Sequence, residues 1–391
     1  MTDGERLEEI VETAVARGDA PGVVAAVGRG DEGYVAAAGV MAAGGPPMRS
    51  DTLFRIASIT KPVTAAVVLS LAEDGLLGLE EPVDRLLPEL ADRRVLRRPD
   101  GPLTDTIRAE RAVTTRDLLT FTWGFGMQGA MFMAPEPWPI VSAVAERELS
   151  SFGPPQPDTT PEPDTFMARL GELPLLAQPG ERWLYSAGSQ VLGVLAARAA
   201  GAPFEDVMRE RVLAPLGMDD TAFYANDTSR LATAYERRDG ELAVSDPPDG
   251  QWSRPPRFPD GAGGLVSTAE DLLRFGRMLL LPGGNPVLTA GDGRRDDPRP
   301  ADPGAAGQGL AGVQLPGRPR LGLRRVGDRV GLLLGGRFRH GLGQRAGPGP
   351  DRGRAHPAGR RRDRAAGRVR AGQDGHVQLA TSGASSPCSR V

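Results

Sequence analysis

The chain has 391 residues, one cysteine and a formal net charge of −3. This length suits one large domain or two ordinary ones, and a single cysteine excludes an internal framework of disulfides. The first residues are polar and acidic, unlike a secretory signal, and no run of residues is apolar for long enough to span a bilayer. We therefore expect a soluble, cytoplasmic protein without a membrane partner.

The small net charge results from two segments of opposite charge. Residues 291–391 contain 20 Arg and 8 Asp, a balance of +12, whereas residues 1–290 have a balance of −15. The 291–391 segment also contains 22 Gly and 9 Pro and has no Lys, Glu, Ile or Tyr. Such a composition is typical of a low-complexity segment. We divide the chain into a folded domain over 1–290 and a tail over 291–391.

Apolar periodicity predicts the first elements of the domain. Residues 4–18 have the spacing of an amphipathic helix, and two apolar runs around a turn predict a β-hairpin over 23–39. A second helix begins near Ser58 and ends at Gly75. The apolar residues that we expect on the buried faces are Leu7, Ile10, Val11 and Val15 in the first helix and Val63, Val67, Val68, Leu71 and Leu76 in the second.

Ser58 and Lys61 stand at the start of this second helix. Residues three apart lie on one face of a helix, so the Ser58 hydroxyl and the Lys61 amine can meet. A serine is a weak nucleophile until a neighbouring group activates it. The alternative is a helix-capping serine followed by a solvated lysine. Lys61 is, however, the only lysine of the chain, and an amine, unlike a guanidinium, loses its proton near neutral pH when desolvated, which favours a catalytic pair.

A loop-rich region follows over residues 124–165. Large apolar side chains gather in and beside it, namely Trp123, Phe125, Met127 and Trp138. We predict that they form the wall of an apolar substrate pocket. The alternative is ordinary core beneath a long loop.

Tyr185 precedes a strongly apolar helix over 191–201. On this loop its hydroxyl can project into a cleft, although a single tyrosine is more often a core residue whose hydroxyl has a partner. A later helix is expected over 272–281, opened by a capping box of Ser267 with Glu270.

Four stretches occur in an order that resembles one family. They are residues 58–61 (Ser-Ile-Thr-Lys), 179–186, 215–218 and 263–272. In these stretches the chain resembles the serine β-lactamase-related hydrolases of the class C type, which include carboxylesterases and D-alanyl peptidases. The resemblance implies an α+β fold of the β-lactamase/transpeptidase type. Its antiparallel sheet combines N-terminal and C-terminal strands and is flanked by helices, with an inserted helical part.

The resemblance also implies roles for three residues. Ser58 would be the acylated nucleophile, Tyr185 the general base, and Lys61 the amine that keeps this base deprotonated or shares its proton. The backbone N–H of Ser58 would supply half of an oxyanion hole, and one such donor contributes about 3 kcal/mol. The substrate would be a small ester or amide, and no cofactor, metal or nucleic acid is implied.

The chain departs from the family at two places. Ala187 stands where class C β-lactamases have the Asn of a Tyr-x-Asn motif, so we expect poor turnover of β-lactams. The third motif of the family, a Lys, His or Trp with a following x-Gly on the far wall of the cleft, is absent beyond about residue 290. The segment from His340 to Gly343 is the nearest match and does not fit.

The tail allows several hypotheses. Out-of-frame translation of a GC-rich gene gives this composition, so a frameshift near residue 290 would explain the tail and the missing motif together. Without its C-terminal strands the domain would have an unpaired edge on the hairpin over 23–39. Residues 360–362 are three arginines that suit nucleic-acid phosphates, but they lack interleaved aromatic residues. His356 and His376 lack metal-ligand spacing.

These observations together predict a serine hydrolase. The preferred activity is that of a carboxylesterase on small acyl esters, which works through an acyl-enzyme on Ser58. The alternatives are a β-lactamase or D-alanyl peptidase, and a catalytically dead relic that lacks the third motif.

Overall fold

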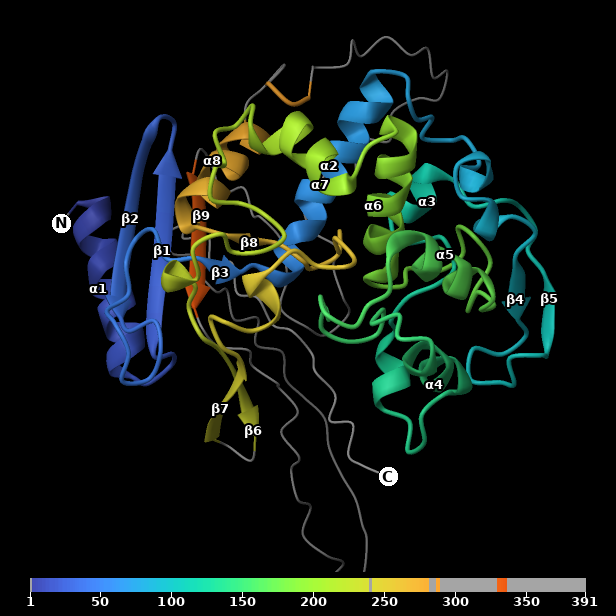
Figure 1. Cartoon of the computed structure of the whole chain (residues 1–391), viewed down its shortest axis with the longest axis horizontal. Coiled ribbons are helices and arrows are strands. Elements are labelled where there is room, and N and C mark those ends of the chain that lie inside the picture. Colours follow the sequence, from blue (N-terminus) through green and yellow to red (C-terminus); the bar gives the residue numbers. More distant parts are fainter. Residues whose placement is uncertain (1, 239–240, 281–285, 289–328, 336–391) are drawn as a thin grey trace, which may run out of the picture.

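The computed structural model describes residues 2–238, 241–280, 286–288 and 329–335. A sheet with one helix on each face forms one side of the molecule, and a cluster of helices forms the other (Figure 1). The helices are α1 (Asp3–Ala16), α2 (Thr60–Glu73), α3 (Thr115–Leu119), α4 (Pro139–Glu146), α5 (Pro163–Gly171), α6 (Ala187–Ala200), α7 (Phe204–Met208) and α8 (Ala269–Leu280). The strands are β1 (Gly22–Arg29), β2 (Glu32–Gly39), β3 (Phe54–Arg55), β4 (Arg94–Leu96), β5 (Thr106–Arg108), β6 (Ala234–Arg238), β7 (Glu241–Asp246), β8 (Val266–Ser267) and β9 (Arg329–Gly335).

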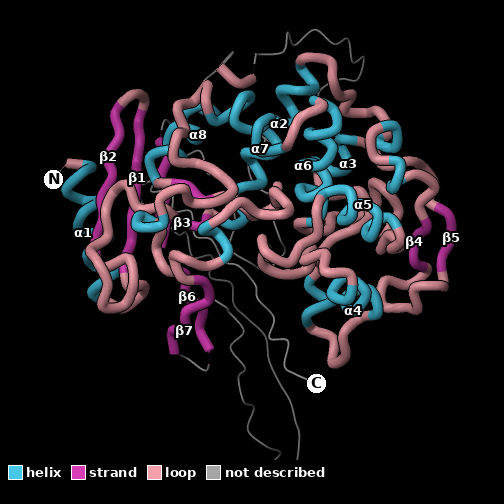
Figure 2. The backbone as a smooth tube through the Cα atoms, in the orientation of Figure 1, coloured by secondary structure: helices cyan, strands magenta, loops and turns pink. Residues whose placement is uncertain are grey.

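The main sheet has the antiparallel order β2-β1-β9. Val23 of β1 faces Ala38 of β2 on one side and Gly335 of β9 on the other. The predicted hairpin is therefore confirmed, and the sheet joins N-terminal and C-terminal strands as the resemblance implied. On the other side of β1, β9 forms a ladder, so the edge that the relic hypothesis would leave unpaired has a neighbour in the described residues. Figure 2 shows these strands apart from the small two-stranded pairs β4-β5 and β6-β7.

Alternate residues of β1 bury their side chains in two different cores, as the period of a strand requires. Val23 and Ala25 pack with Val11 of α1 in a small cluster. Val24 points to the other face and joins the main core together with Leu273 of α8. The sheet is thus the middle layer between α1 and α8 (Figure 1).

Two glycines of the hairpin let α8 lie close to the sheet. A Cβ atom at Gly28 would come within 2.9 Å of Leu273 Cδ1, and one at Gly33 within 2.5 Å of Arg277 Nη2. The chain enters α8 from β8, which pairs with β3 three residues before Ser58. The packing of α8 on the sheet therefore also places the start of α2.

The helical part is built around α2 and α6, which pack against each other and are contacted by α3 and α7. The predicted buried face of α2 is confirmed at Val63, Val67, Val68 and Leu71, all fully buried. These residues anchor α2 in the main core.

Two residues of the predicted apolar faces are exposed instead. Leu76 is 41% exposed because α2 ends at Glu73 and Gly75, with a φ of +75°, turns the chain away. Ile10 of α1 is also 41% exposed, whereas Val11 beside it is buried against the sheet. A single helix makes a narrow contact with the face of a sheet, so only part of the apolar face predicted for α1 is buried.

The N-terminal cap of α8 lies one residue later than predicted. Thr268 caps the helix, and its Oγ1 atom accepts the N–H of Asp271 at 3.2 Å. Ser267 cannot serve as the cap because it belongs to β8, and its hydroxyl lies 2.7 Å from that of Thr221. Pairing of β8 with β3 thus overrides the local sequence signal.

The region predicted to be loop-rich contains α4 and the start of α5 besides its loops. Both helices begin with a proline, Pro139 and Pro163. A proline is well tolerated there because the first N–H groups of a helix have no partner within the helix.

Most of the predicted tail over 291–391 lies outside the described residues, and only β9 falls within them. His340, His356, His376 and residues 360–362 lie outside as well. Within the described part of the chain, none of the helices combines the length and the apolar character needed to cross a bilayer.

The close approach of α6 to α3 generates a prediction about stability. A Cβ atom at Gly188 in α6 would lie 2.7 Å from the backbone oxygen of Leu118. We expect Gly188→Ala to lower the free energy of unfolding by about 1–3 kcal/mol, as overpacking does. The control is Gly129→Ala, since a Cβ there meets nothing within 4 Å. Urea denaturation of both variants measures the difference, and equal midpoints would contradict the close packing.

Candidate active site

Ser58 lies in a short 3₁₀ turn, Ala57–Ile59, between β3 and α2. The turn is tied to the strand side by the Ile56 N–H, which donates to the Leu265 oxygen at 2.9 Å. Ala57 has a φ of +45°, a left-handed conformation that is uncommon for a residue with a side chain. Ser58 itself is half-buried. The chain therefore turns sharply at Ala57, directly before Ser58, and then enters the buried helix α2.

Lys61 is the buried partner of this serine and is only 9% exposed. Its Nζ donates to Ser58 Oγ at 3.0 Å and to the backbone oxygen of Ala262 at 2.6 Å. The same atom lies 4.6 Å from the centre of the Tyr185 ring. An ammonium has three donors, and these contacts come from three separate segments of the chain.

Tyr185 completes the cluster from the loop before α6. Its hydroxyl donates to Ser58 Oγ at 2.8 Å. Its backbone exchanges two hydrogen bonds with Met127, of 2.8 and 2.9 Å. The ring stacks on Trp183 at 5.6 Å between centroids and meets the edge of Phe121 at 5.9 Å. Backbone and ring contacts together fix the direction of the phenol.

The residue after Tyr185 is strained. Ser186 has φ +85° and ψ −64°, and the Ala187 N–H lies 3.3 Å from the Tyr185 oxygen. This is a γ-turn of the rare positive-φ type. Such a conformation costs about 1–3 kcal/mol and persists only where the surroundings enforce it. Here Ala187 and the helix behind it are buried in the main core.

A glycine-rich loop supplies the carbonyl that contacts Lys61. Asp260 opens this loop and is buried. Its carboxylate accepts the N–H of Ala262 at 2.6 Å and the amide of Gln190 at 3.0 Å. Burial raises the pKa of the Asp260 carboxyl, and these donors and the nearby Lys61 act in the opposite direction.

Sequence reasoning did not identify Asp260, Ala262 or Gln190 as part of the site. A backbone carbonyl leaves no signal in the residue type, so Ala262 cannot be found by motif. The acidic residue directly before the glycine-rich run 261–264 was the one available indication.

The four residues predicted to line a substrate pocket lie in different environments. Trp123 and Phe125 are fully buried and belong to the main core, so they reach no open pocket. This corrects the pocket interpretation for both of them, because the loop folds inward there. Met127 and Trp138 are half-buried. Met127 lies next to the site through its backbone bonds to Tyr185.

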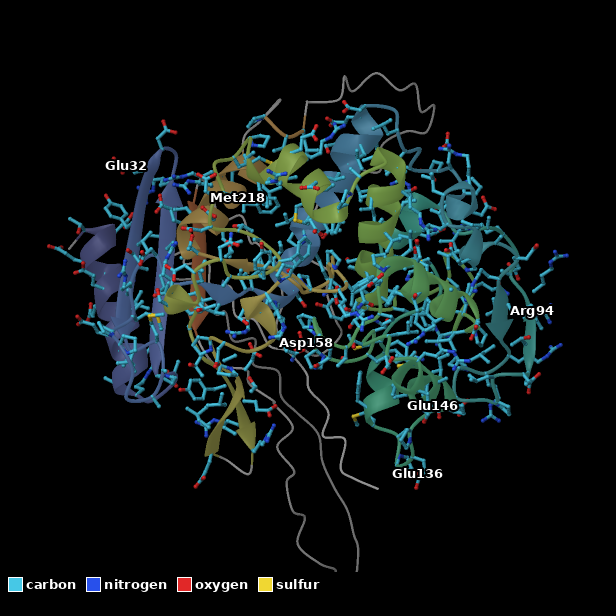
Figure 3. All side chains as sticks on the ribbon, viewed as in Figure 1. Glu32, Arg94, Glu136, Glu146, Asp158 and Met218 are labelled. Carbon is cyan, nitrogen blue, oxygen red and sulfur yellow. The ribbon has the colours of Figure 1, made fainter. Side chains whose placement is uncertain are left out.

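The arrangement brings together Ser58, Lys61 and Tyr185, which are separated in sequence, around one hydroxyl oxygen. A hydroxyl in contact with an amine and a phenol has two neighbours that can accept or return its proton. Figure 3 shows side chains between the sheet side and the helical side, with Asp158 near the middle of the view. The Asp158 carboxylate pairs with Arg254.

Comparison with known proteins places this site in a family. The model of the β-lactamase family matches residues 7–340. Esterase EstB of Burkholderia gladioli is 34% identical over 316 residues, which cover 74% of each chain. Protein Rv1367c of Mycobacterium tuberculosis is 41% identical over 242 residues, which are 60% of this chain. The chain spans only 56% of the length of that mycobacterial relative.

A solved structure supports the same assignment. Simvastatin synthase LovD of Aspergillus terreus superposes with a TM-score of 0.58 at 26% identity, over 74% of this chain and 71% of LovD. The α+β fold of the β-lactamase/transpeptidase type is thereby established for the described part. On the family match and on its likeness to EstB, the chain belongs to the β-lactamase family.

Proposed function

We propose that this chain is a serine hydrolase that cleaves small acyl esters through an acyl-enzyme on Ser58. The observation that carries the proposal is the Ser58 hydroxyl, which lies 2.8 Å from the Tyr185 hydroxyl and 3.0 Å from the Lys61 amine. The likeness to an esterase of the same family supports an ester as the substrate.

In the first half of the reaction, Tyr185 acts as the phenolate: Ser58 Oγ attacks the carbonyl carbon of the ester, and the Ser58 proton passes to the phenolate oxygen. Hydroxyl hydrogens rotate, so the same 2.8 Å contact serves whether Tyr185 gives or receives the proton. Lys61, held between Ser58 and Ala262, balances the negative charge of the phenolate before this transfer. The carbon–oxygen bond to the leaving alcohol then breaks, and the alcohol takes the proton.

In the second half, water attacks the acyl-enzyme. Tyr185 accepts a proton from this water, and the proton returns to Ser58 Oγ as the acid is released. The charge on the carbonyl oxygen needs donors in both halves. The Ser58 N–H is suited to this role. Ser58 is the second residue of its 3₁₀ turn, and the first N–H groups of such a turn have no partner within it.

The proposal predicts distinct effects for variants of the cluster. Ser58→Ala should reduce hydrolysis of p-nitrophenyl butyrate by at least about a thousandfold, as loss of a nucleophile does. Lys61→Arg and Tyr185→Phe should each cost at least about a hundredfold, because a guanidinium keeps its proton and a phenyl ring has none to exchange. Steady-state kinetics measures all three.

The matched control is Ser70→Ala. Ser70 is a buried serine within α2, and its hydroxyl bonds only to the backbone oxygen of Val67 among the described contacts. It should keep the activity of the parent chain. Unchanged hydrolysis by Ser58→Ala would refute the proposed nucleophile.

Preference for esters over β-lactams is the second prediction. Ala187 offers no amide to a substrate, and it is fully buried at the start of α6. We expect kcat/KM for p-nitrophenyl butyrate to exceed that for nitrocefin by at least about a hundredfold, because a missing hydrogen bond to a substrate amide penalises the lactam. A larger value for nitrocefin would favour the β-lactamase alternative.

The status of residues 291–391 is a separate proposal. We propose that 1–290 is the hydrolase domain and that a frameshift near residue 290 produced the tail. The family match and the pairing of β9 with β1 both extend beyond this point, so the coding DNA decides between the two. Reading the coding DNA across codons 280–300 in all three frames tests it. We expect one alternative frame to encode a Trp, Lys or His followed by x-Gly. If no frame does, and the chain hydrolyses no ester, the dead-relic alternative holds.

A further inference from the structure

Asp260 fixes the backbone of Ala262, including the two peptide groups on either side of its Cα, beside Lys61. One of its oxygens accepts the Ala262 N–H at 2.6 Å, while the Ala262 oxygen accepts the Lys61 amine at 2.6 Å. The backbone oxygen of Asp260 also accepts the N–H of Gly264 at 2.8 Å. The N–H of Ala262 is thus held by the Asp260 carboxylate, and the carbonyl of Ala262 is directed at the Lys61 amine.

The other carboxylate oxygen is fixed from α6. Gln190 donates to it at 3.0 Å, and the amide oxygen of Gln190 accepts the Ser151 hydroxyl at 2.8 Å. All three side chains are buried, with exposures of 6%, 2% and 1% for Asp260, Gln190 and Ser151. Ser151 follows a strained segment in which Glu148 and Ser150 have φ values of +58° and +51°. The network therefore connects the glycine-rich loop to two other segments.

A turn-capping role alone does not require a charge at this position. Asparagine or serine also accepts an N–H two residues ahead, whereas a carboxylate is costly to bury unless an opposite charge is near. Burial raises the pKa of the Asp260 carboxyl, and the positive charge of Lys61 acts against this larger effect to lower that pKa. The titratable groups that face Lys61 are Tyr185, from the loop before α6, and Asp260, from the loop before β8.

We propose that Asp260 is a positioning residue for Lys61, which directs the Ala262 carbonyl onto the amine and supplies the negative charge that balances it. The proposal rests on the proposed function in that Lys61 belongs to the reacting cluster. It concerns the amine rather than the substrate, so it can be tested without turnover.

The single lysine of the chain makes this test direct. The full chain is produced with ¹³C-labelled lysine, so that one Cε resonance reports the protonation of one amine. The resonance is followed against pH in the parent chain and in Asp260→Asn. We expect the titration midpoint to move to lower pH in the variant by on the order of one unit, because a nearby negative charge favours the ammonium.

Asp271→Asn is the matched control. Asp271 is a carboxylate of the same stretch, 1% exposed, and burial raises its pKa as well. Its oxygens bind the Asp220 N–H, the Thr221 hydroxyl and Arg274. Asp271→Asn should leave the titration midpoint of the Lys61 resonance at the value found in the parent chain. A midpoint that is the same in all three proteins would overturn the proposal.

Kinetics separates this proposal from the proposed function. If the parent chain hydrolyses esters, Asp260→Ala should lower kcat by about tenfold or more with KM changed less than about threefold, and Asp260→Asn should recover part of the loss. Asp271→Ala should lower the melting temperature without this change in kcat. If the parent chain hydrolyses nothing, the proposed function fails, and the lysine titration still decides the role of Asp260.

Discussion

A buried amine must find acceptors for its protons, and this requirement shapes the whole site. Lys61 meets it with the Ser58 hydroxyl, the Ala262 carbonyl and the face of the Tyr185 ring. These groups come from the 3₁₀ turn before α2, a glycine-rich loop and the loop before α6. None of the three segments can place the amine by itself, so the cluster exists only when the sheet side and the helical side are both folded.

The cost of this convergence is visible in the backbone. The residue before Ser58 and the residue after Tyr185, Ala57 and Ser186, both have positive φ values. Each such conformation costs about 1–3 kcal/mol. The adjoining helices α2 and α6 offset this cost, because both are buried along most of their length and pack against each other. Strain at the site is thus maintained by the core immediately behind it.

Much of the fold follows from periodicity and turn residues. The hairpin of β1 and β2, the buried face of α2 and the end of α6 at Gly201 agree with the sequence patterns. The approach of Ser58 to Lys61 follows from their spacing, and Tyr185 was indicated by its place before an apolar helix. These features are local, so local sequence contains them.

The failures have a common cause in tertiary contacts. An apolar residue type does not tell whether a side chain faces a pocket or a core, and Trp123 and Phe125 face the core. The cap of α8 moves to Thr268 because a strand pair occupies Ser267. The carbonyl of Ala262 reaches Lys61 through a backbone turn that residue types do not reveal.

The pairing of β1 with β9 has a consequence for the order in which the molecule assembles. Val23 faces Gly335, so one of the first strands to leave the ribosome pairs with the last strand described. Closing so long a loop is slow, because the chain loses entropy before the contact forms. Until β9 is synthesised, β1 exposes unpaired N–H and carbonyl groups, which other chains can bind. The sheet is therefore completed only after translation has passed β9, while the helices around Ser58 have all the residues they need much earlier.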